Sequence, residues 1–144
     1  ALGNTNYLNL SGCYNIRDVS TLGHVRTLIL SHCHSLSDVS ALGSVWTLDL
    51  SSCYNLYDVS ALGHVYSLNL SECDNIIDIS ALGSVKFLDI RGCNNITDIS
   101  MLNPKNLQFP DGGKWCDLVD SDLLFPLIPF PLSRTFPTKR YRDP

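Results

Sequence analysis

The sequence is poor in charge, because Asp, Glu, Lys and Arg together make up 17% of its 144 residues. No apolar run approaches the roughly 20 residues that a membrane-spanning helix needs. The chain also does not open on the charged and then apolar stretch of a signal peptide. From these absences we expect no membrane partner.

Basic residues and prolines are scarce in most of the chain. Residues 1–103 hold four Lys/Arg against nine Asp/Glu, whereas all seven prolines lie in residues 104–144. Phosphate binding needs a basic face. The mildly acidic balance of residues 1–103 therefore argues against a nucleic-acid partner.

What the chain does have is a repeat with a fixed spacing of 20 residues. The cysteines that mark it are Cys13, Cys33, Cys53, Cys73 and Cys93, and each is followed five residues later by an aspartate (Asp18, Asp38, Asp58, Asp78 and Asp98). A strict period of this length is typical of a solenoid, in which each repeat packs on its neighbours.

One repeat, from Val25 to Val45, shows how a coil is built. Its apolar residues are spaced by three except for one step of two, between Leu28 and Leu30. The step of two predicts a short strand near residues 27–31, and steps of three suit tight turns and 3-10 segments. About 15 residues remain for the rest of the coil, too few for two connections and an ordinary helix. The predicted fold is an α/β-type solenoid of short parallel strands with modest curvature.

Three residue types that recur at fixed positions of the repeat, serine, glycine and aspartate, are interpreted as parts of the scaffold. We expect the Ser40 hydroxyl to cap a short helical turn and Gly43 to end that turn with a positive φ. Stacked aspartates such as Asp38 repel each other unless they accept backbone N–H groups or stay solvated. The same expectations apply to the equivalent residues of the other repeats.

Six cysteines in a short chain could form disulfides, but five of them share one repeat position. This pattern predicts a column of buried thiols and, with no signal peptide in view, a reducing, cytoplasmic setting. Neighbouring cysteines should lie about 4.8 Å apart, so an occasional disulfide between them remains an alternative. Cys116 lies outside the column and is either packed or a free thiol.

The pattern Val25-x-x-Leu28-x-Leu30-x-x-Cys33-x-x-Leu36 resembles a leucine-rich repeat. Cys93, Ile96 and Asp98 resemble the cysteine-containing subclass of ubiquitin-ligase adaptors, and Asp98 to Leu102 is similar to internalin-like bacterial repeats. The repeat is shorter than the former and has Cys where the latter have Asn. The resemblance covers residues 1 to about 109 and implies an arc of about five coils whose concave strand face recognises proteins. It implies no particular partner.

The domain organisation follows from the repeat and its break after Leu102. The predicted solenoid spans 1–109, with repeats 6–25, 26–45, 46–65, 66–85 and 86–109. Pro110 to Gly113 is a strong turn signal, and residues 110–132 are interpreted as a C-terminal cap followed by a flexible tail at 133–144. The alternative is that the whole tail is disordered. Because the chain opens in mid-repeat, we expect a fragment of a longer array.

Outward positions of the predicted strands vary between repeats while inward ones do not, which favours a binding face. Trp46 beside Tyr66, flanked by Arg26 and Lys86, has the composition of an interface hot spot. The alternative is an ordinary soluble face with scattered aromatics. The predicted partner-binding residues are Tyr7, Arg26, Ile29, His32, Trp46, Asp49, Tyr66, Asn69, Glu72, Lys86, Phe87, Asp89 and Arg91.

The remaining residue clusters lack the patterns of reactive or ligand-binding sites. No catalytic, cofactor or metal site is therefore expected. His32-Cys33-His34 lacks metal-ligand spacing, and Cys33 should be buried and unreactive. Asp49, Asn69 and Asp89 predict a hydrated acidic stripe rather than a cation site. The column that contains Tyr14, His34 and Tyr54 is explained by stacking.

The functional prediction is a non-enzymatic module that binds a protein partner of unknown identity on its concave strand face. The alternative is a structural segment that self-associates as a homo-oligomer through open sheet edges at the repeat ends.

Overall fold

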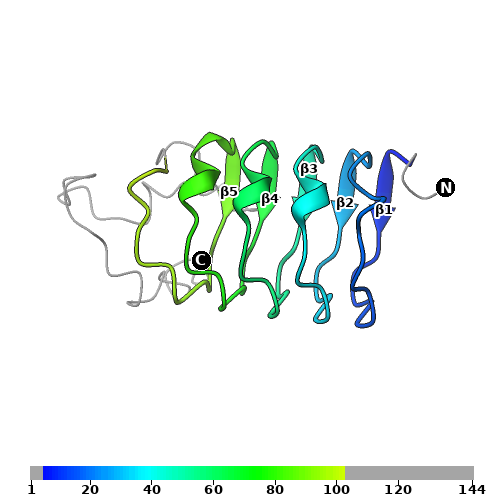
Figure 1. Ribbon diagram of the computed structural model, residues 1–144, viewed down its shortest axis with the longest axis horizontal. Helices are drawn as coiled ribbons and strands as arrows, with labels where there is room; N and C mark the ends of the chain where they lie inside the picture. Colours follow the sequence, from blue (N-terminus) through cyan, green and yellow to red (C-terminus); the bar gives the residue numbers. More distant parts are fainter. Residues whose placement is uncertain (1–4, 103–144) are drawn as a thin grey trace, which may run out of the picture.

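The computed structural model describes residues 5–102, which wind into a row of similar coils (Figure 1). The strands are β1 (Tyr7–Asn9), β2 (Thr27–Ile29), β3 (Thr47–Asp49), β4 (Ser67–Asn69) and β5 (Phe87–Asp89). They form one parallel sheet in chain order, and each residue pairs with the residue 20 positions later, as Leu28 does with Leu48. The solenoid prediction is confirmed. The predicted cap at 110–132, the tail at 133–144 and residues 103–109 lie outside the described residues.

Each strand is three residues long, shorter than the predicted 27–31. Main-chain hydrogen bonding to the next coil nevertheless continues, since the N–H of Leu30 bonds the Asp49 carbonyl at 2.8 Å and that of His32 bonds Ser51 at 2.8 Å. At His32 the φ is 59°, in the left-handed region. This turn ends the extended conformation, because a strand needs a strongly negative φ.

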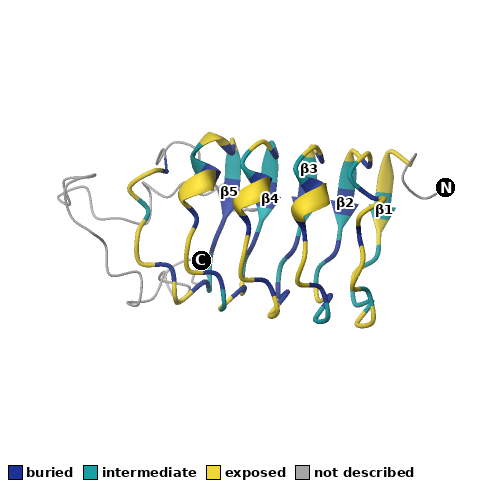
Figure 2. Ribbon diagram, in the orientation of Figure 1, coloured by how far each residue is buried: buried dark blue, intermediate teal, exposed yellow. Residues whose placement is uncertain are grey.

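The core is a continuous apolar column inside the coils, drawn dark blue in Figure 2. In the second coil Leu28, Leu30, Cys33 and Leu36 are fully buried. Their equivalents in the third and fourth coils are also buried, so every internal coil is covered by both neighbours. Burial of such side chains, at about 1.5–3 kcal/mol each, is the main source of stability in a stacked array.

Short 3-10 segments complete the coils on the side away from the strands (Figure 1). They are η2 (Ser40–Leu42), η3 (Ser60–Leu62) and η4 (Ser80–Ser84). The predicted serine cap is wrong, because no side chain caps these segments and Val39 stands at the N-cap of η2. Instead the Asp38 carboxylate accepts the N–H of Ser40 at 2.9 Å. A short acidic side chain forms this local turn more readily than a hydroxyl does.

The glycine that follows η2 and η3 is needed for space and not for a left-handed backbone. Gly43 has φ −62°, so the predicted positive φ is wrong. A Cβ on Gly43 would lie 2.5 Å from the carbonyl oxygen of Ala61 in the next coil. Neighbouring coils therefore approach closely enough here that only a glycine fits. Between residues 5 and 102 the structure contains no helix that is long and apolar enough to cross a membrane.

Candidate protein-binding surface

A row of side chains crosses successive coils where the strands begin, and we call Arg26, Trp46, Tyr66 and Phe87 the aromatic row. The first three directly precede β2, β3 and β4, and Phe87 is the first residue of β5. The ring centroids of Trp46 and Tyr66 are 4.3 Å apart and their planes differ by 11°, so the two rings are stacked. The guanidinium carbon of Arg26 lies 5.8 Å from the Trp46 ring centroid. Tyr66 meets Phe87 at a centroid distance of 5.3 Å and an angle of 77°. The row is therefore continuous across four coils.

The backbone holds this row in place. The N–H of Trp46 bonds the Arg26 carbonyl at 3.1 Å, and the N–H of Tyr66 bonds the Trp46 carbonyl at 3.1 Å. Residues one repeat apart thus lie about one strand spacing apart, ~4.8 Å, which suits ring stacking. Planar side chains that recur at this position of the repeat are therefore brought together by the 20-residue spacing.

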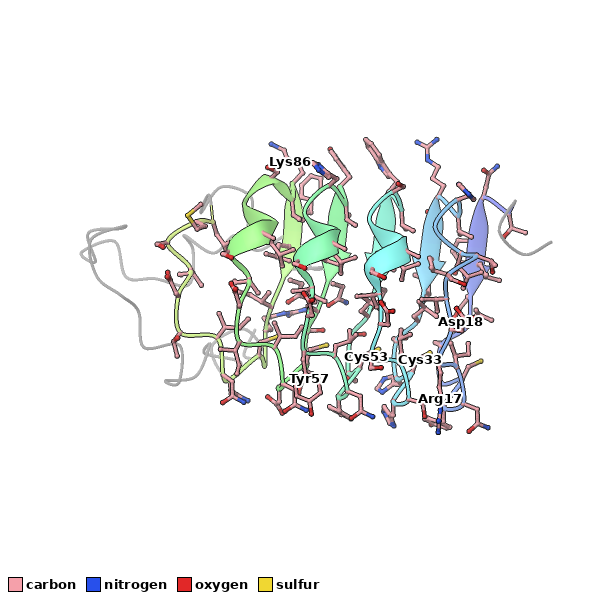
Figure 3. All side chains as sticks on the ribbon, viewed as in Figure 1. Arg17, Asp18, Cys33, Cys53, Tyr57 and Lys86 are labelled. Carbon is pink, nitrogen blue, oxygen red and sulfur yellow. The ribbon has the colours of Figure 1, made fainter. Side chains whose placement is uncertain are left out.

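The aromatic row is open to solvent on its outer edge. Trp46 is 48% exposed, and Tyr66 and Phe87 are half-buried. Arg26 and Lys86 are exposed at the two ends, and Figure 3 shows Lys86 at the edge of the array opposite to Arg17 and Tyr57. A shallow hollow beside the row is lined by Gly23, His24, Val25, Arg26, Ser44 and Trp46. The structure thus places five predicted binding residues, Arg26, Trp46, Tyr66, Lys86 and Phe87, in one strip.

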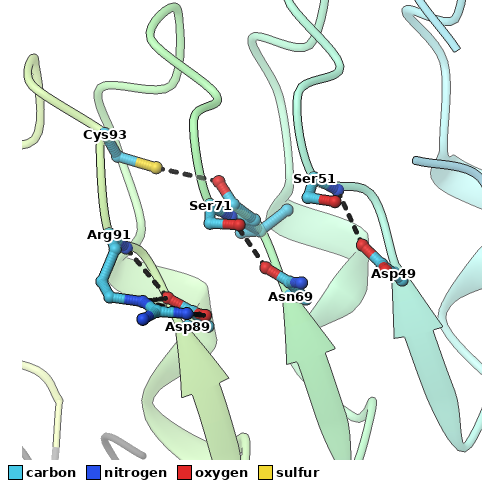
Figure 4. A network of polar contacts seen from close by, with 8 residues as sticks. Asp49, Ser51, Asn69, Ser71, Asp89, Arg91 and Cys93 are labelled. Carbon is cyan, nitrogen blue, oxygen red and sulfur yellow. Dashed lines mark hydrogen bonds and ion pairs between the residues drawn. The ribbon is translucent and has the colours of Figure 1, made fainter. Parts of the chain in front are cut away.

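A second group of predicted residues lies at the other end of the strands and is engaged with the backbone. Asp49 accepts the N–H of Ser51 at 2.9 Å, and Asn69 accepts that of Ser71 at 2.9 Å (Figure 4). These side chains close the turn that follows each strand. The predicted stripe thus also has a structural role, because one side-chain oxygen of each residue accepts a backbone N–H.

Asp89 and Arg91 form an ion pair within this second group. Arg91 Nη2 lies 2.7 Å from Asp89 Oδ2, and Arg91 Nε also bonds the carboxylate (Figure 4). Asp89 also accepts the N–H of Arg91 at 3.1 Å, and it is 5% exposed. A carboxylate this buried and this well satisfied has little capacity left for a partner.

The other predicted residues lie along the strands and in the turns that follow them. Tyr7 is exposed on β1, and Ile29 is half-buried on β2. His32 and Glu72 are exposed at equivalent left-handed turns, with φ 59° and 62°. No ring contact among the described residues links Ile29 or Glu72 to the aromatic row, but Ile29 pairs with Asp49 across β2 and β3.

Cross-coil contacts of the asparagine column were not found from the sequence. Asn55 Nδ2 donates to the His34 carbonyl at 2.6 Å, and Asn75 Nδ2 donates to Tyr54 at 2.5 Å. The signal that could have found them was the repetition of asparagine at positions 15, 55, 75 and 95. The rings beside them are neighbours as predicted but are tilted and not stacked, since the His34 ring centroid lies 5.1 Å from that of Tyr14 at 42° and 4.9 Å from that of Tyr54 at 36°.

The cysteine column belongs to the core. Cys33, Cys53, Cys73 and Cys93 are fully buried, Cys13 is half-buried, and all five are free thiols. Burial raises the pKa of Cys53, Cys73 and Cys93 to about 12. Such thiols stay protonated at neutral pH and are poor nucleophiles and poor metal ligands. Within the described part of the chain, no three His, Cys, Asp or Glu side chains cluster as a metal site would require.

The coil geometry now permits comparison with known proteins. An internalin (inlF) from Listeria monocytogenes matches with a TM-score of 0.60 and 24% identity, over 74% of this chain and 34% of that one. The chain has the leucine-rich repeat fold. This leucine-rich repeat segment spans about a third of the length of that internalin structure.

Two looser matches among leucine-rich repeat structures also come from Listeria monocytogenes. Internalin C2 (inlC2) matches with a TM-score of 0.47 and 20% identity, over 71% of this chain and 48% of that one. The functional domain of InlJ, which includes a cysteine ladder, matches with a TM-score of 0.36 and 17% identity, over 62% and 30%. No protein-family model and no curated protein matches the sequence. At these identities the likeness concerns the fold alone.

Proposed function

We propose that this leucine-rich repeat segment is a non-enzymatic interaction module that binds a protein partner through the aromatic row and the adjoining strand face. The observation that carries the proposal is the stacked pair of Trp46 and Tyr66, open to solvent and flanked by Arg26 and Lys86. Trp, Tyr and Arg dominate the binding energy of protein interfaces. Protein interfaces are enriched in exposed aromatics, and the rest of the surface is not.

Rigidity supports the same proposal. Trp46 is held between Arg26 and Tyr66, and its backbone is bonded to both neighbouring coils. A side chain that is already ordered loses less conformational entropy when a partner binds it, which favours affinity. The bonded side chains at the other end of the strands, such as Asn69, would contribute shape and little energy.

The proposal is tested by capturing partners from a native lysate on the immobilised chain and identifying them by mass spectrometry. The captured partner is then titrated against the variants Trp46→Ala and Tyr66→Ala. We expect each variant to weaken binding at least roughly tenfold, the cost of losing a hot-spot residue. Melting temperature, followed by circular dichroism, should change little because both rings lie outside the core.

The matched control is Tyr57→Ala. Tyr57 is 61% exposed and lies at the opposite edge of the array (Figure 3). Binding should not respond to it. If affinity is unchanged in the Trp46 and Tyr66 variants, or falls equally in the Tyr57 variant, the row is not the binding surface.

Self-association is the second candidate, supported by the first coil. Leu8, Leu10 and Ile16 are half-buried there, whereas their equivalents Leu28, Leu30 and Leu36 in the second coil are fully buried. A second copy stacked on this coil would cover them, as exposed edges of sheets favour. Light scattering over a wide concentration range decides the matter, since a monomer throughout would exclude this candidate.

We also keep a reducing, cytoplasmic setting as a proposal, supported by the five free thiols of the column. Trapping thiols with an alkylating reagent in intact cells, followed by mass spectrometry, tests it. A disulfide among these cysteines in freshly trapped protein would contradict it.

A further inference from the structure

We propose that the partner presents an extended acidic segment to the aromatic row, with two carboxylate side chains about four residues apart that meet Arg26 and Lys86. This inference rests on the proposed function and names the chemistry of the segment that the row would bind. It is carried by the orientation of the rings, the placement of charge and the spacing of the two cations.

Both sides of the Trp46 ring in the aromatic row already have a neighbour. Trp46 has the Arg26 guanidinium on one side in the coil order and the Tyr66 ring on the other. Tyr66 has the Trp46 ring stacked on one face and meets Phe87 in a T-shaped contact. A sugar or a nucleobase needs a free aromatic face on which to stack. Trp46, the most exposed ring of the row, offers its edge instead, so these two ligand classes suit the row less well.

Ring edges attract negative charge, because the aromatic quadrupole is negative on the face and positive at the edge. The indole N–H of Trp46 and the hydroxyl of Tyr66 add donors of the kind that carboxylates accept. The outer edge of the row therefore favours anionic or strongly accepting groups.

The charge distribution points the same way. Residues 5–102 contain nine Asp/Glu, yet none occurs at the positions of the rim, 24–27, 44–47, 64–67 and 84–87. Arg26 and Lys86 are on this rim, and neither forms an ion pair with another described residue. His24 and His64 lie there too. The rim is thus the positive strip of an otherwise acidic array, which gives an acidic partner a place to bind.

The spacing of the two cations suggests the form of the segment. Arg26 and Lys86 are three coils apart, about 14 Å at ~4.8 Å per parallel strand. An extended peptide rises about 3.3 Å per residue, so four residues cover this span, and side chains four apart point to the same side. A carboxylate pair at positions i and i+4 could therefore reach both cations at once.

A nucleic acid fits the strip less well. The affinity of a protein for a polyanion increases with the number of phosphates that Lys and Arg neutralise. Two free cations provide few such contacts, and the carboxylates of the remaining array repel a long polyanion. The acidic peptide is favoured because it needs only two charge contacts.

The test pans a random peptide display library against the full chain. We expect enrichment of Asp or Glu at two positions four residues apart. A synthetic enriched peptide and its Gln-substituted counterpart are then titrated by fluorescence anisotropy. The double variant Arg26→Gln/Lys86→Gln should weaken the acidic peptide roughly tenfold, the sum of two exposed charge contacts. Added salt should weaken it further, because exposed charges are screened.

The control is Arg17→Gln, an exposed cation at the opposite edge (Figure 3). It should leave the affinity unchanged. Peptides without acidic residues, no enriched peptide, or equal affinity for the Gln counterpart would each overturn the inference. So would a single-stranded oligothymidylate that binds the row as tightly as the acidic peptide does.

The same titration separates this inference from the proposed function. If enriched peptides are not acidic but lose affinity in Trp46→Ala, the row is a protein-binding surface with another preference. If the peptides bind equally well to Trp46→Ala and Tyr66→Ala, both the acidic segment and the row as binding surface are wrong.

Discussion

The Sγ of Cys53 donates a hydrogen bond of 3.2 Å to the main-chain carbonyl of Leu30 in the preceding coil. The same carbonyl accepts the N–H of Cys33 at 3.2 Å. The thiol thus donates to the second lone pair of the buried Leu30 carbonyl, which would otherwise have a single hydrogen-bond partner. Cys73 and Cys93 repeat the contact with Leu50 and Leu70, at 3.1 and 3.0 Å. The cysteine column therefore links coils as well as filling the core.

The Cys73→Ala variant should lower the free energy of unfolding by about 1–3 kcal/mol, since it removes a buried sulfur and leaves a carbonyl with fewer partners. Urea unfolding followed by circular dichroism measures this change. Cys13→Ala is the control, and it should cost less because Cys13 is half-buried. Equal losses in both variants would contradict the role of burial and of the cross-coil bond.

The cysteine column should also make the protein sensitive to alkali. Burial raises the pKa of Cys53, Cys73 and Cys93 to about 12, above the ordinary value of 9.0 that applies in the unfolded chain. The unfolded state then binds fewer protons than the folded state above pH 9.0. The contribution to stability is complete below pH 9.0 and is lost as pH rises toward about 12.

This pH dependence is measured as the free energy of unfolding in urea at a series of alkaline pH values. The Cys93→Val variant is the comparison, because it keeps an apolar side chain but cannot deprotonate. Its stability should fall less steeply with pH than that of the parent chain. Identical slopes for the two proteins would show that the thiols do not cause the loss.

Two glycine variants separate a lack of space from a backbone requirement. Gly43→Ala should cost roughly 2–4 kcal/mol, because its Cβ would lie 2.5 Å from the Ala61 carbonyl oxygen and the coils must separate. Gly12→Ala should cost about 1 kcal/mol, since nothing lies within 4 Å of that Cβ but its φ is 71°. Thermal or urea unfolding of both variants checks the order. A larger cost at Gly12 would contradict it.

Ser52 holds a left-handed conformation, with φ 57°, at the position that glycine occupies in the first and fifth coils. Ser52→Gly should be more stable than Ser52→Ala by about 1 kcal/mol, because alanine keeps the Cβ that crowds this conformation. Comparing two variants that both lack the hydroxyl removes its contribution from the difference. Urea midpoints measure the difference, and a more stable alanine variant would show that the turn is not strained.

The core and the strand positions were predictable from the sequence because inward residues obey the period. Leu28, Leu30 and Cys33 are apolar in their equivalents throughout, and burial selects for that character regardless of the neighbours. The serines and glycines recurred equally regularly, but their regularity alone did not reveal which atoms they contact. Ser40 is bonded through its backbone N–H, and Gly43 is required by a carbonyl of another coil.

The candidate binding surface was predictable in composition and not in arrangement. Trp46 and Tyr66 stood out as exposed aromatics beside two cations, and the structure stacks them. Asp49 and Asp89 also varied between repeats, yet their carboxylates are engaged by backbone N–H groups two residues on. Variation between repeats therefore does not distinguish a side chain free for recognition from one that closes a turn.

By itself the sequence determined the repeat length, the buried column and the parallel stacking, because a 20-residue period allows one coil geometry in which the same positions face inward every time. The tertiary structure decided which contacts form between neighbouring coils. The contact of Gly43 with Ala61, the bond from Cys53 to Leu30 and the stacking of Trp46 on Tyr66 all depend on the distance and direction between coils. That relationship arises only when the coils pack, so no single repeat contains it.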